Sequence, residues 1–276
     1  MQIKPLAGSL GAEIIGADVR NADTQGEIEA AFADHSVLVF RDQNLSPEDH
    51  RAFAKRFGNI NINRFFKPVD GHPDIALVFK DKDHKRAIGE GWHTDHSYDT
   101  EPALGSILCA HEVPPIGGDT LFVSMSKAFE GLSEPIQKLI SGLSAWHSSR
   151  HNFGNNTKDS EAAKTGRLLN QDAAQQDALH PMVIRHPLSG RPCLYVNPTF
   201  TLRIEGLNED ESRAILDMLY THCQKPEFQC RVRWNAGDVT MWDNRATWHK
   251  AVNDYHGHRR LMHRITVEGC ALEAAF

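Results

Sequence analysis

The sequence lacks the long apolar stretches of a membrane protein. No part of its 276 residues approaches the ~18 uninterrupted apolar residues that a membrane-spanning helix needs. Its first 20 residues also lack a basic region followed by an apolar core, which argues against a secretion signal. We therefore expect no membrane partner and a cytoplasmic location.

Cysteine is sparse, and its spacing predicts no disulfide framework. The five cysteines are odd in number, and no two of them have the C-x-x-C spacing. We interpret them as reduced thiols, as is usual in cytosolic proteins. A chain of this length buries enough surface to be stable without disulfides or a structural metal.

Excess positive charge is also missing. Thirty basic and 36 acidic side chains give a formal net charge of -6, which argues against a nucleic-acid partner because such proteins present a basic face. A local basic pocket remains compatible with this balance. The chain is rich in histidine instead, with 16 residues, and this raises the expectation of a metal site.

Short β-rich runs dominate the chain, and no internal repeat appears. Turn-forming residues separate the runs, as in the stretches 114–119 and 235–238. We predict a mainly β fold with flanking helices, in a single domain over residues 1–276. The predicted strands lie at 37–40, 75–79, 106–109, 120–123, 193–196 and 239–242.

Three helices are indicated by their N-terminal capping signals. Ser46 followed by proline predicts a helix over 47–57. Ser133 opens a second, over 134–142, with a turn of helix at 125–131 before it. Asn208 with glutamate three residues later resembles a capping box for a helix over 209–224.

The segment 148–180 differs in composition from the rest of the chain. It is polar, rich in Asn, Gln, Ala and Asp, and poor in β-branched residues. We predict a long surface insertion, and in enzymes such insertions are often lids over the active site. A solvated loop with a short helix is an equally good interpretation.

The triplet His93-Thr94-Asp95 is a candidate metal-binding motif. On an extended strand, residues i and i+2 point to the same face, so His93 and Asp95 can reach one ion. Such a triplet also occurs by chance in a histidine-rich chain. A second one, at 72–74, contains a proline that predicts a turn, and nothing downstream matches it.

The C-terminal part of the chain adds a histidine and two arginines. His249 follows a predicted strand, and the run 260–267 alternates so that Arg260, Met262 and Arg264 share one face. Buried arginines need anionic partners, because an unpaired buried charge is expensive. The partners are either internal Asp or Glu residues or a carboxylate ligand, which guanidinium binds with two parallel hydrogen bonds.

Two histidines and one carboxylate form a facial triad that leaves open positions on the metal. This set is typical of non-haem Fe(II) oxygenases. Zinc more often takes three histidines in catalytic sites, or thiolates in structural ones. We therefore expect His93, Asp95 and His249 to be the metal ligands, with Fe(II) as the metal.

At this point the sequence resembles, nearly end to end, the taurine and 2,4-dichlorophenoxyacetate dioxygenase family of Fe(II)- and 2-oxoglutarate-dependent enzymes. The combined spacing is highly specific: a His-x-Asp motif, a threonine 25 residues after it, a distal histidine and an arginine 11 beyond. The stretches that carry the resemblance are LGAEI at 10–14, FRDQ at 40–43, WHTD at 92–95, VPPIGGDT at 113–120, WDNR at 242–245 and residues 249–264.

The resemblance implies a double-stranded β-helix (jelly roll) fold and a set of site residues. Thr120 and Arg260 would hold the distal carboxylate of 2-oxoglutarate. Arg264 would lie near the iron-bound carboxylate and the anionic group of the substrate. With O2, the enzyme would hydroxylate its substrate and release succinate and CO2, the cofactor performing the difficult step.

The substrate is less defined by the resemblance. Phe153 and Phe200 occupy positions where related enzymes place aromatic residues around the substrate, although core packing would explain them equally well. His96 directly follows the motif and is expected on the substrate side, with solvent exposure as the alternative. We expect a small organic anion: a sulfonate, alkyl sulfate, carboxylate or aryloxyalkanoate, its anionic end on Arg264.

Two other functions compete with this interpretation. A zinc-type metallohydrolase or isomerase would use the same three ligands without needing Thr120 and Arg260. An inactive ligand-binding barrel would not be expected to keep a competent residue at every metal and cosubstrate position. Family members are often dimers or tetramers, so a homo-oligomer is possible.

Overall fold

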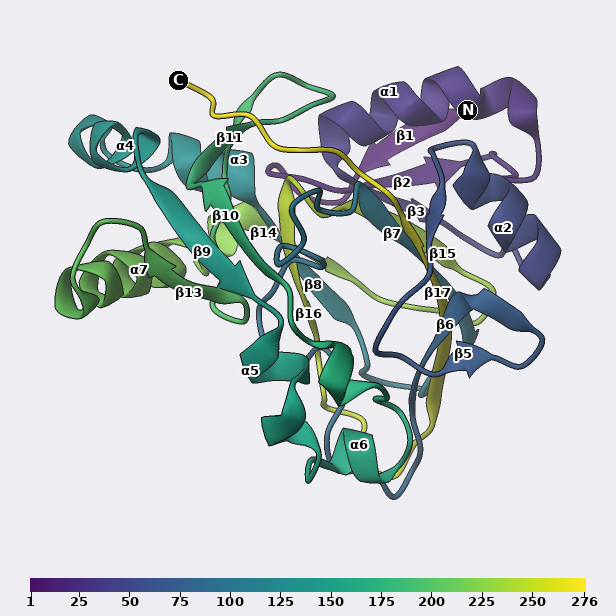
Figure 1. Ribbon diagram of the computed structural model, residues 1–276. Helices are drawn as coiled ribbons and strands as arrows, with labels where there is room; N and C mark the ends of the chain where they lie inside the picture. The colour runs from purple at the N-terminus through teal and green to yellow at the C-terminus, as the bar shows by residue number, and fades with distance from the viewer.

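Two facing β-sheets form the centre of the computed structural model, which describes residues 1–276 (Figure 1). The larger sheet has nine strands and the facing sheet has three. The nine strands are β1 (Gln2–Pro5), β2 (Ala12–Ile15), β3 (Val37–Phe40), β4 (Ile60–Asn61), β5 (Pro68–Val69), β6 (His72–Lys80), β7 (Gly105–Glu112), β15 (Val239–Asp243) and β17 (Arg260–Val267). The three strands are β8 (Thr120–Ser124), β14 (Gln229–Val232) and β16 (Thr247–Ala251).

Strands distant in sequence are neighbours in both sheets. The order in the larger sheet is β1-β2-β3-β15-β7-β17-β6-β5, with β4 also pairing with β17, and the order in the smaller sheet is β14-β8-β16. Every pairing is antiparallel except that of β2 with β3. Two minor sheets complete the β structure: β9 (Ser144–Ser148), β10 (Asp177–Pro181) and β13 (Thr201–Ile204) in one, and β11 (Val183–Arg185) and β12 (Pro192–Leu194) in the other.

The space between the two main sheets is a packed core. Leu108 and Met262 from the larger sheet are buried in one cluster with Phe122 and Val232 from the smaller sheet. Burial of apolar area from both inner faces is what holds such a sandwich together, at ~25 cal/mol per Å². The architecture is mainly β, as predicted.

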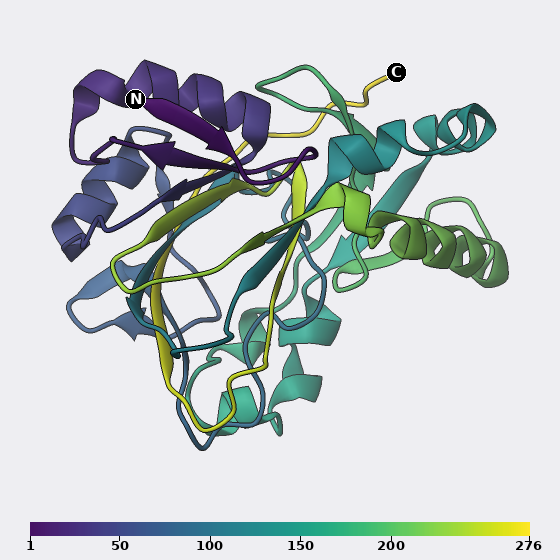
Figure 2. The ribbon, with the colours of Figure 1, turned by 180° about the vertical axis from the view of Figure 1, so that it is seen from behind.

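Helices cover the outer faces of this sandwich (Figure 2). Ile28 and Phe32 of α1 and Phe53 of α2 pack against Leu38 and Ile107 on the outer face of the larger sheet. The seven α-helices are α1 (Gln25–His35), α2 (Pro47–Lys55), α3 (Met125–Glu130), α4 (Glu134–Ser141), α5 (Arg150–Phe153), α6 (Glu161–Lys164) and α7 (Glu209–Cys223). None of them has the length and apolarity that crossing a membrane demands.

Most of the predicted elements are present at the predicted places. Every predicted strand overlaps a strand of the structure, and the helices over 47–57, 134–142 and 209–224 appear as α2, α4 and α7. Of the three N-terminal signals, Ser46 and Asn208 each form a reciprocal capping box, whereas Ser133 forms no side-chain cap.

Two predictions about local structure are wrong or incomplete. Helix α1 was not predicted, because its N-cap, Thr24, forms no side-chain cap and only three of its residues are buried. The triplet at 72–74 is not a turn. It begins β6, and Asp74 is bound by Arg51 rather than placed for a metal.

The segment 148–180 folds into short helices at the end of the molecule opposite the two termini (Figure 1). It contains α5 and α6 together with the 3-10 turns η2 (Asn155–Thr157) and η3 (Gln171–Ala173), and it leads into β10. The other two 3-10 turns are η1 (Ala22–Thr24) and η4 (Pro226–Phe228).

Capping of α2 makes a measurable contribution to stability. Ser46 Oγ accepts a hydrogen bond from the Asp49 amide at 3.1 Å, whereas Ser133, the N-cap of α4, forms no side-chain cap. We expect Ser46→Ala to lower the free energy of unfolding by ~1 kcal/mol. The matched change Ser133→Ala should cost less than ~0.5 kcal/mol. Urea denaturation of both variants measures this, and equal losses would contradict it.

Candidate active site

Two histidines that are distant in sequence are joined by their backbones. His93 and His249 form an isolated bridge in which the His93 amide donates to His249 O at 3.1 Å, and the His249 amide to His93 O at 2.8 Å. His249 lies in β16. The sequence had indicated an extended strand at His93 and Asp95. In the structure His93 makes only this isolated bridge, and a turn begins at Asp95. The turn still brings Asp95 beside the two imidazoles.

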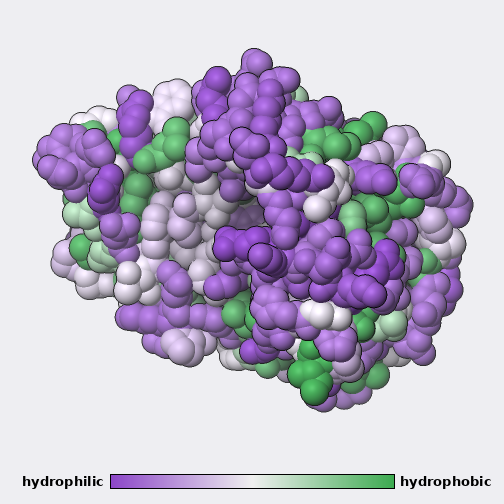
Figure 3. Space-filling view, turned by 90° about the horizontal axis from the view of Figure 1, so that it is seen from below, coloured by the Kyte–Doolittle hydropathy of each residue, from purple (hydrophilic) through white to green (hydrophobic).

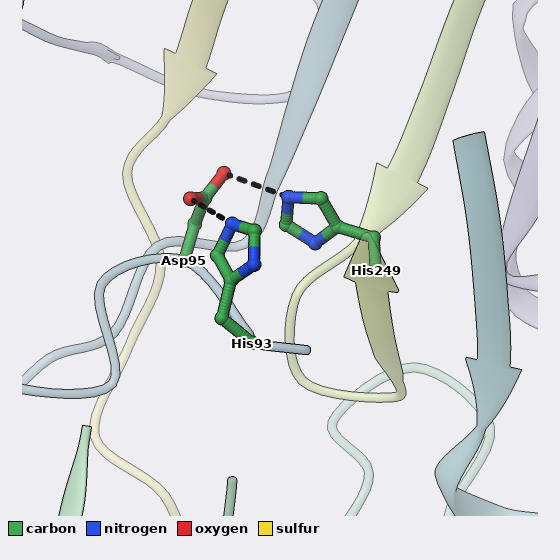
Figure 4. Close-up of side chains that lie close together, drawn as sticks. All are labelled: His93, Asp95 and His249. Atoms are coloured by element: carbon green, nitrogen blue, oxygen red, sulfur yellow. Dashed lines mark ion pairs between the residues drawn. The ribbon is translucent and has the colours of Figure 1, made fainter. Parts of the chain in front are cut away.

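The three side chains converge on one point (Figure 4). Nε2 of His93 lies 3.7 Å from Oδ1 of Asp95, and Nε2 of His249 lies 3.8 Å from Oδ2. One ligand atom from each residue lies within 4.8 Å of the other two, and all three residues are buried. This spacing is suited to one metal ion bound by two nitrogens and one carboxylate.

The protonation states also suit a metal. Nδ1 of His93 lies 2.8 Å from Gly91 O, so this nitrogen carries the proton and Nε2 keeps its lone pair toward Asp95. Burial lowers the pKa of both His93 and His249, which favours the neutral imidazoles that metals bind.

Asp95 is held as a carboxylate by its neighbours. Burial opposes its ionisation, but the adjacent Arg264 guanidinium outweighs burial and keeps the pKa of Asp95 below its usual range. Nη1 of Arg264 lies 3.1 and 3.3 Å from the two carboxylate oxygens, and Ser106 Oγ donates to Oδ2 at 3.0 Å. The sequence left open whether Arg264 pairs with an internal carboxylate or with a ligand. The structure shows the internal partner, Asp95.

Arg260 has no such partner. Burial alternates from Arg260 to Arg264, with Arg260, Met262 and Arg264 facing inward as predicted, whereas residues 264–267 are all buried. Nε of Arg260 donates to Gly118 O at 3.1 Å, but its Nη2 is buried without a partner, and no carboxylate lies within ion-pair distance. Burial accordingly lowers the pKa of this guanidinium. Thr120 lines the same cavity.

One cavity of about 450 Å³ connects these groups. The end of the molecule where α5 and α6 lie is hollowed between mainly hydrophilic residues (Figure 3). The structure thus brings together the predicted metal ligands, cosubstrate residues and aromatic residues. Those that line this cavity are His93, Asp95, His249, Thr120, Arg260, Arg264, Phe153 and Phe200.

His96 is the exception among the predicted site residues. A positive φ of 61° turns the chain at His96, and its Nδ1 lies 2.9 Å from Oδ2 of Asp99. It lines a second cavity with Asp99 and Arg64. His96 is buried, so the alternative of an exposed side chain is wrong as well.

Three residues of the site were missed by the sequence analysis. Ser106 orients Asp95, Trp242 lies with its ring centroid 4.8 Å from that of His249, and Phe66 lies 4.6 Å from the Arg264 guanidinium. Ser106 and Trp242 are inward residues of predicted strands, and nothing in their spacing distinguishes them from core residues.

Comparison with known proteins now identifies the family. Residues 2–266 match the family model described as taurine catabolism dioxygenase TauD, TfdA family. The chain belongs to the TauD/TfdA family. It is 34% identical to an alpha-ketoglutarate-dependent sulfate ester dioxygenase of Pseudomonas putida, over 98% of this chain and 90% of that protein. It is 35% identical to the alpha-ketoglutarate-dependent 2,4-dichlorophenoxyacetate dioxygenase of Cupriavidus pinatubonensis, over 95% of this chain and 96% of that protein.

Solved structures of TauD/TfdA proteins agree with this fold. A taurine dioxygenase from Burkholderia xenovorans superposes with a TM-score of 0.81 at 33% identity, covering 98% of this chain and 92% of that one. AAD-2 in complex with Mn(II) and N-oxalylglycine superposes with a TM-score of 0.75 at 28% identity, covering 97% of both chains. The predicted resemblance, the jelly-roll fold and the enzyme class, a 2-oxoglutarate-dependent non-haem iron dioxygenase, are confirmed.

The hydrogen bond from Ser106 makes a testable contribution to metal binding. Ser106→Ala removes the donor that orients Asp95 and should weaken Mn(II) binding by ~10-fold, as is typical when a group that supports a metal ligand is lost. Ser212→Ala is the matched control, because its buried Oγ accepts from the Ile204 amide far from the site. Titration of both with Mn(II), followed by electron paramagnetic resonance, measures the effect. Equal affinities would contradict the orienting role.

Proposed function

We propose that this cavity binds Fe(II) through His93, Asp95 and His249, and 2-oxoglutarate through Arg260 and Thr120. The enzyme hydroxylates a small organic anion. The observation that carries the proposal is Arg260, a buried cation without a carboxylate partner in the same cavity as the triad. A buried uncompensated charge costs several kcal/mol, about as much as an anionic ligand would recover.

Each protein group has a definite task in this proposal. When bound, iron, 2-oxoglutarate and O2 supply the oxidation of a C–H bond, with succinate and CO2 as products. Arg260 and Thr120 fix the distal carboxylate of 2-oxoglutarate. Ser106 and Arg264 orient Asp95, and Phe200 and Trp242 line the cavity beside the histidines and exclude water.

Arg264 is also suited to the anionic end of the substrate. Its Nη1 is engaged with Asp95, but its Nε is buried without a partner and the residue lines the cavity. A guanidinium with free donors binds carboxylate, sulfonate or sulfate groups well. The printed names of the relatives, a sulfate ester dioxygenase and a dichlorophenoxyacetate dioxygenase, support an anionic substrate.

The competing functions leave part of the cavity unexplained. A zinc-type metallohydrolase or isomerase has no use for an unpaired arginine in the same cavity as the triad. An inactive binding barrel would not need neutral histidines around an ionised carboxylate. We further propose a cytoplasmic location, because all five cysteines are free thiols. We also propose that the protein is a homo-oligomer, either a dimer or a tetramer.

Chelation of iron by the keto acid gives a direct test. Anaerobic addition of Fe(II) and 2-oxoglutarate together should produce a weak visible charge-transfer band that neither produces alone. Arg260→Met should raise the 2-oxoglutarate concentration needed to produce half of this band by about 100-fold, because one partner of a buried charge pair is removed. Metal affinity should not change.

The neighbouring Arg259 is the matched control for this test. Its guanidinium is partly exposed and pairs with Asp81 and Glu112, so Arg259→Met should leave the band nearly unchanged. The free energy of unfolding of the ligand-free Arg260→Met variant should not fall, since a buried unpaired charge is removed. Metal binding without any band in the wild-type protein would favour the zinc-type function.

We also propose that the segment 148–180 acts as a lid. It supplies Asn152, Phe153 and Leu168 to the cavity wall, and it lies at the hollowed end of the molecule. Closing an active site in this way excludes water and commits the bound substrate.

Limited proteolysis tests the lid. The side chains of Lys158 and Lys164 are 53% and 62% exposed, so trypsin should cleave after them in the ligand-free protein. Anaerobic Fe(II), 2-oxoglutarate and an anionic substrate together should slow this cleavage several-fold. Cleavage after Lys138 in α4, whose side chain is 74% exposed, should not change. Equal protection at all three sites would contradict local closure.

A further inference from the structure

The part of the cavity beyond the metal ligands is bounded by an apolar wall. Its members line the cavity and also pack together as one cluster with Phe65 and Tyr98. The residues of this apolar wall are Phe66, Ile88, Phe153, Leu168 and Phe200.

The wall begins at the metal site and continues through a series of aromatic contacts. Phe200 lies edge-on to the metal ligand His93, with ring centroids 6.4 Å apart, and Phe153 lies 5.7 Å from Phe200. Phe66 lies 6.1 Å from Phe153 and packs on the Arg264 guanidinium. An anion on Arg264 therefore has its carbon atoms directed along aromatic rings.

The two aliphatic members, Ile88 and Leu168, come from two loops that are bound to each other. Glu161, at the start of α6, accepts hydrogen bonds from the amides of Lys85 and Arg86, both at 2.8 Å. Arg167, which is fully buried, donates to Glu161 at 3.0 Å and to Arg86 O at 2.8 Å. We call this arrangement the clamp.

A second connection holds Leu168 against the aromatic residues. Leu168 bridges Phe66, and the Leu169 amide donates to Phe65 O at 2.7 Å. Leu168 is therefore held from both sides, by the bridge on one and by the clamp on the other. With the segment 148–180 closed over the cavity, these two connections set the position of Leu168 in the wall.

The carboxylates in this part of the cavity are already used. Glu161 belongs to the clamp, where the Lys85 amide, with the Arg86 amide and Arg167, lowers its pKa to about 2 despite some burial. Glu90 is paired with Arg86 and accepts from Asn253 at 2.9 Å. An ammonium group on a substrate would lose its hydration here without gaining a free carboxylate.

We propose that the site selects organic anions with an uncharged, apolar carbon body, and that Ile88 and Leu168 determine how long a body it accepts. This specificity rests on the proposed dioxygenase function. The anionic group binds Arg264, the carbon chain lies on the apolar wall, and the clamp sets the distance of Ile88 and Leu168 from the metal when the segment 148–180 is closed. The head group is a sulfate ester, a sulfonate or a carboxylate, and these share the same contact with guanidinium.

The first experiment compares two substrates of equal size. Propanesulfonate and taurine differ in that a methyl group of one is an ammonium group in the other. In O2-consumption assays with Fe(II) and 2-oxoglutarate, kcat/KM for propanesulfonate should exceed that for taurine by at least about tenfold, because only the ammonium needs a counter-charge. A preference for taurine would overturn the proposal.

The second experiment varies chain length, using ethyl to decyl sulfates and the variants Leu168→Ala and Leu168→Phe. Leu168→Ala should lower kcat/KM for hexyl sulfate about tenfold, mainly through KM, and move the preferred length upward. Leu168→Phe should move it downward. The controls are Leu169→Ala and Leu169→Phe, since Leu169 is exposed and does not line the cavity.

The outcomes separate this proposal from the function on which it rests. If the Fe(II)–2-oxoglutarate band forms, but Leu168 and Leu169 variants show the same length preference, the specificity is wrong and the dioxygenase stands. If the band does not form, the dioxygenase assignment itself fails. If no alkyl sulfate or sulfonate at millimolar concentration either supports turnover or perturbs the band, the apolar-anion class is wrong. The band also shows that each variant is folded.

Discussion

Two guanidinium groups buried four residues apart on β17 are the constraint on which the site depends. Arg264 is compensated by Asp95, and the same contact keeps that carboxylate ionised between two neutral histidines. Arg260 has no carboxylate, although its cost of burial is similar. The strand thus carries one charge that is paired at the candidate metal site and one that is left unpaired, which in the proposed function is completed by the cosubstrate.

The metal ligands depend on the completed sheet and not on a local motif. A backbone bridge to β16 holds His93 beside His249. Strand β16 in turn pairs with β8, the strand that begins with Thr120. Formation of the ligand set is therefore coupled to formation of the sandwich. Ser106, on β7 of the facing sheet, gives Asp95 an orienting hydrogen bond in the absence of metal, which reduces the reorganisation needed on binding.

How much could be predicted from sequence follows from the range of the interactions. Alternation along 260–267 placed Arg260 and Arg264 on one inward face because a strand's period is local. Which arginine has an internal partner could not be predicted, since Asp95 is 169 residues from Arg264 in the chain. His96 was misplaced for a local reason: its positive φ reverses the chain, a conformation that an isolated histidine does not signal. Helix α1 was missed because its capping and its apolar face are both weak.

The two parts of the cavity differ in what they leave open. Around the metal, folding leaves donors free: Nη2 of Arg260 and Nε of Arg264 are buried without partners. Around the apolar wall the carboxylates are used, because Glu161 and Glu90 are bound to the backbone and side chains of neighbouring loops. The unpaired arginine donors favour an anionic group near the metal. The carboxylates beside the apolar wall are already hydrogen-bonded, so they do not compensate the desolvation of an ammonium group. A ligand gains most by being charged at Arg264 and apolar beyond it, which makes discrimination among anions depend on the shape of the wall.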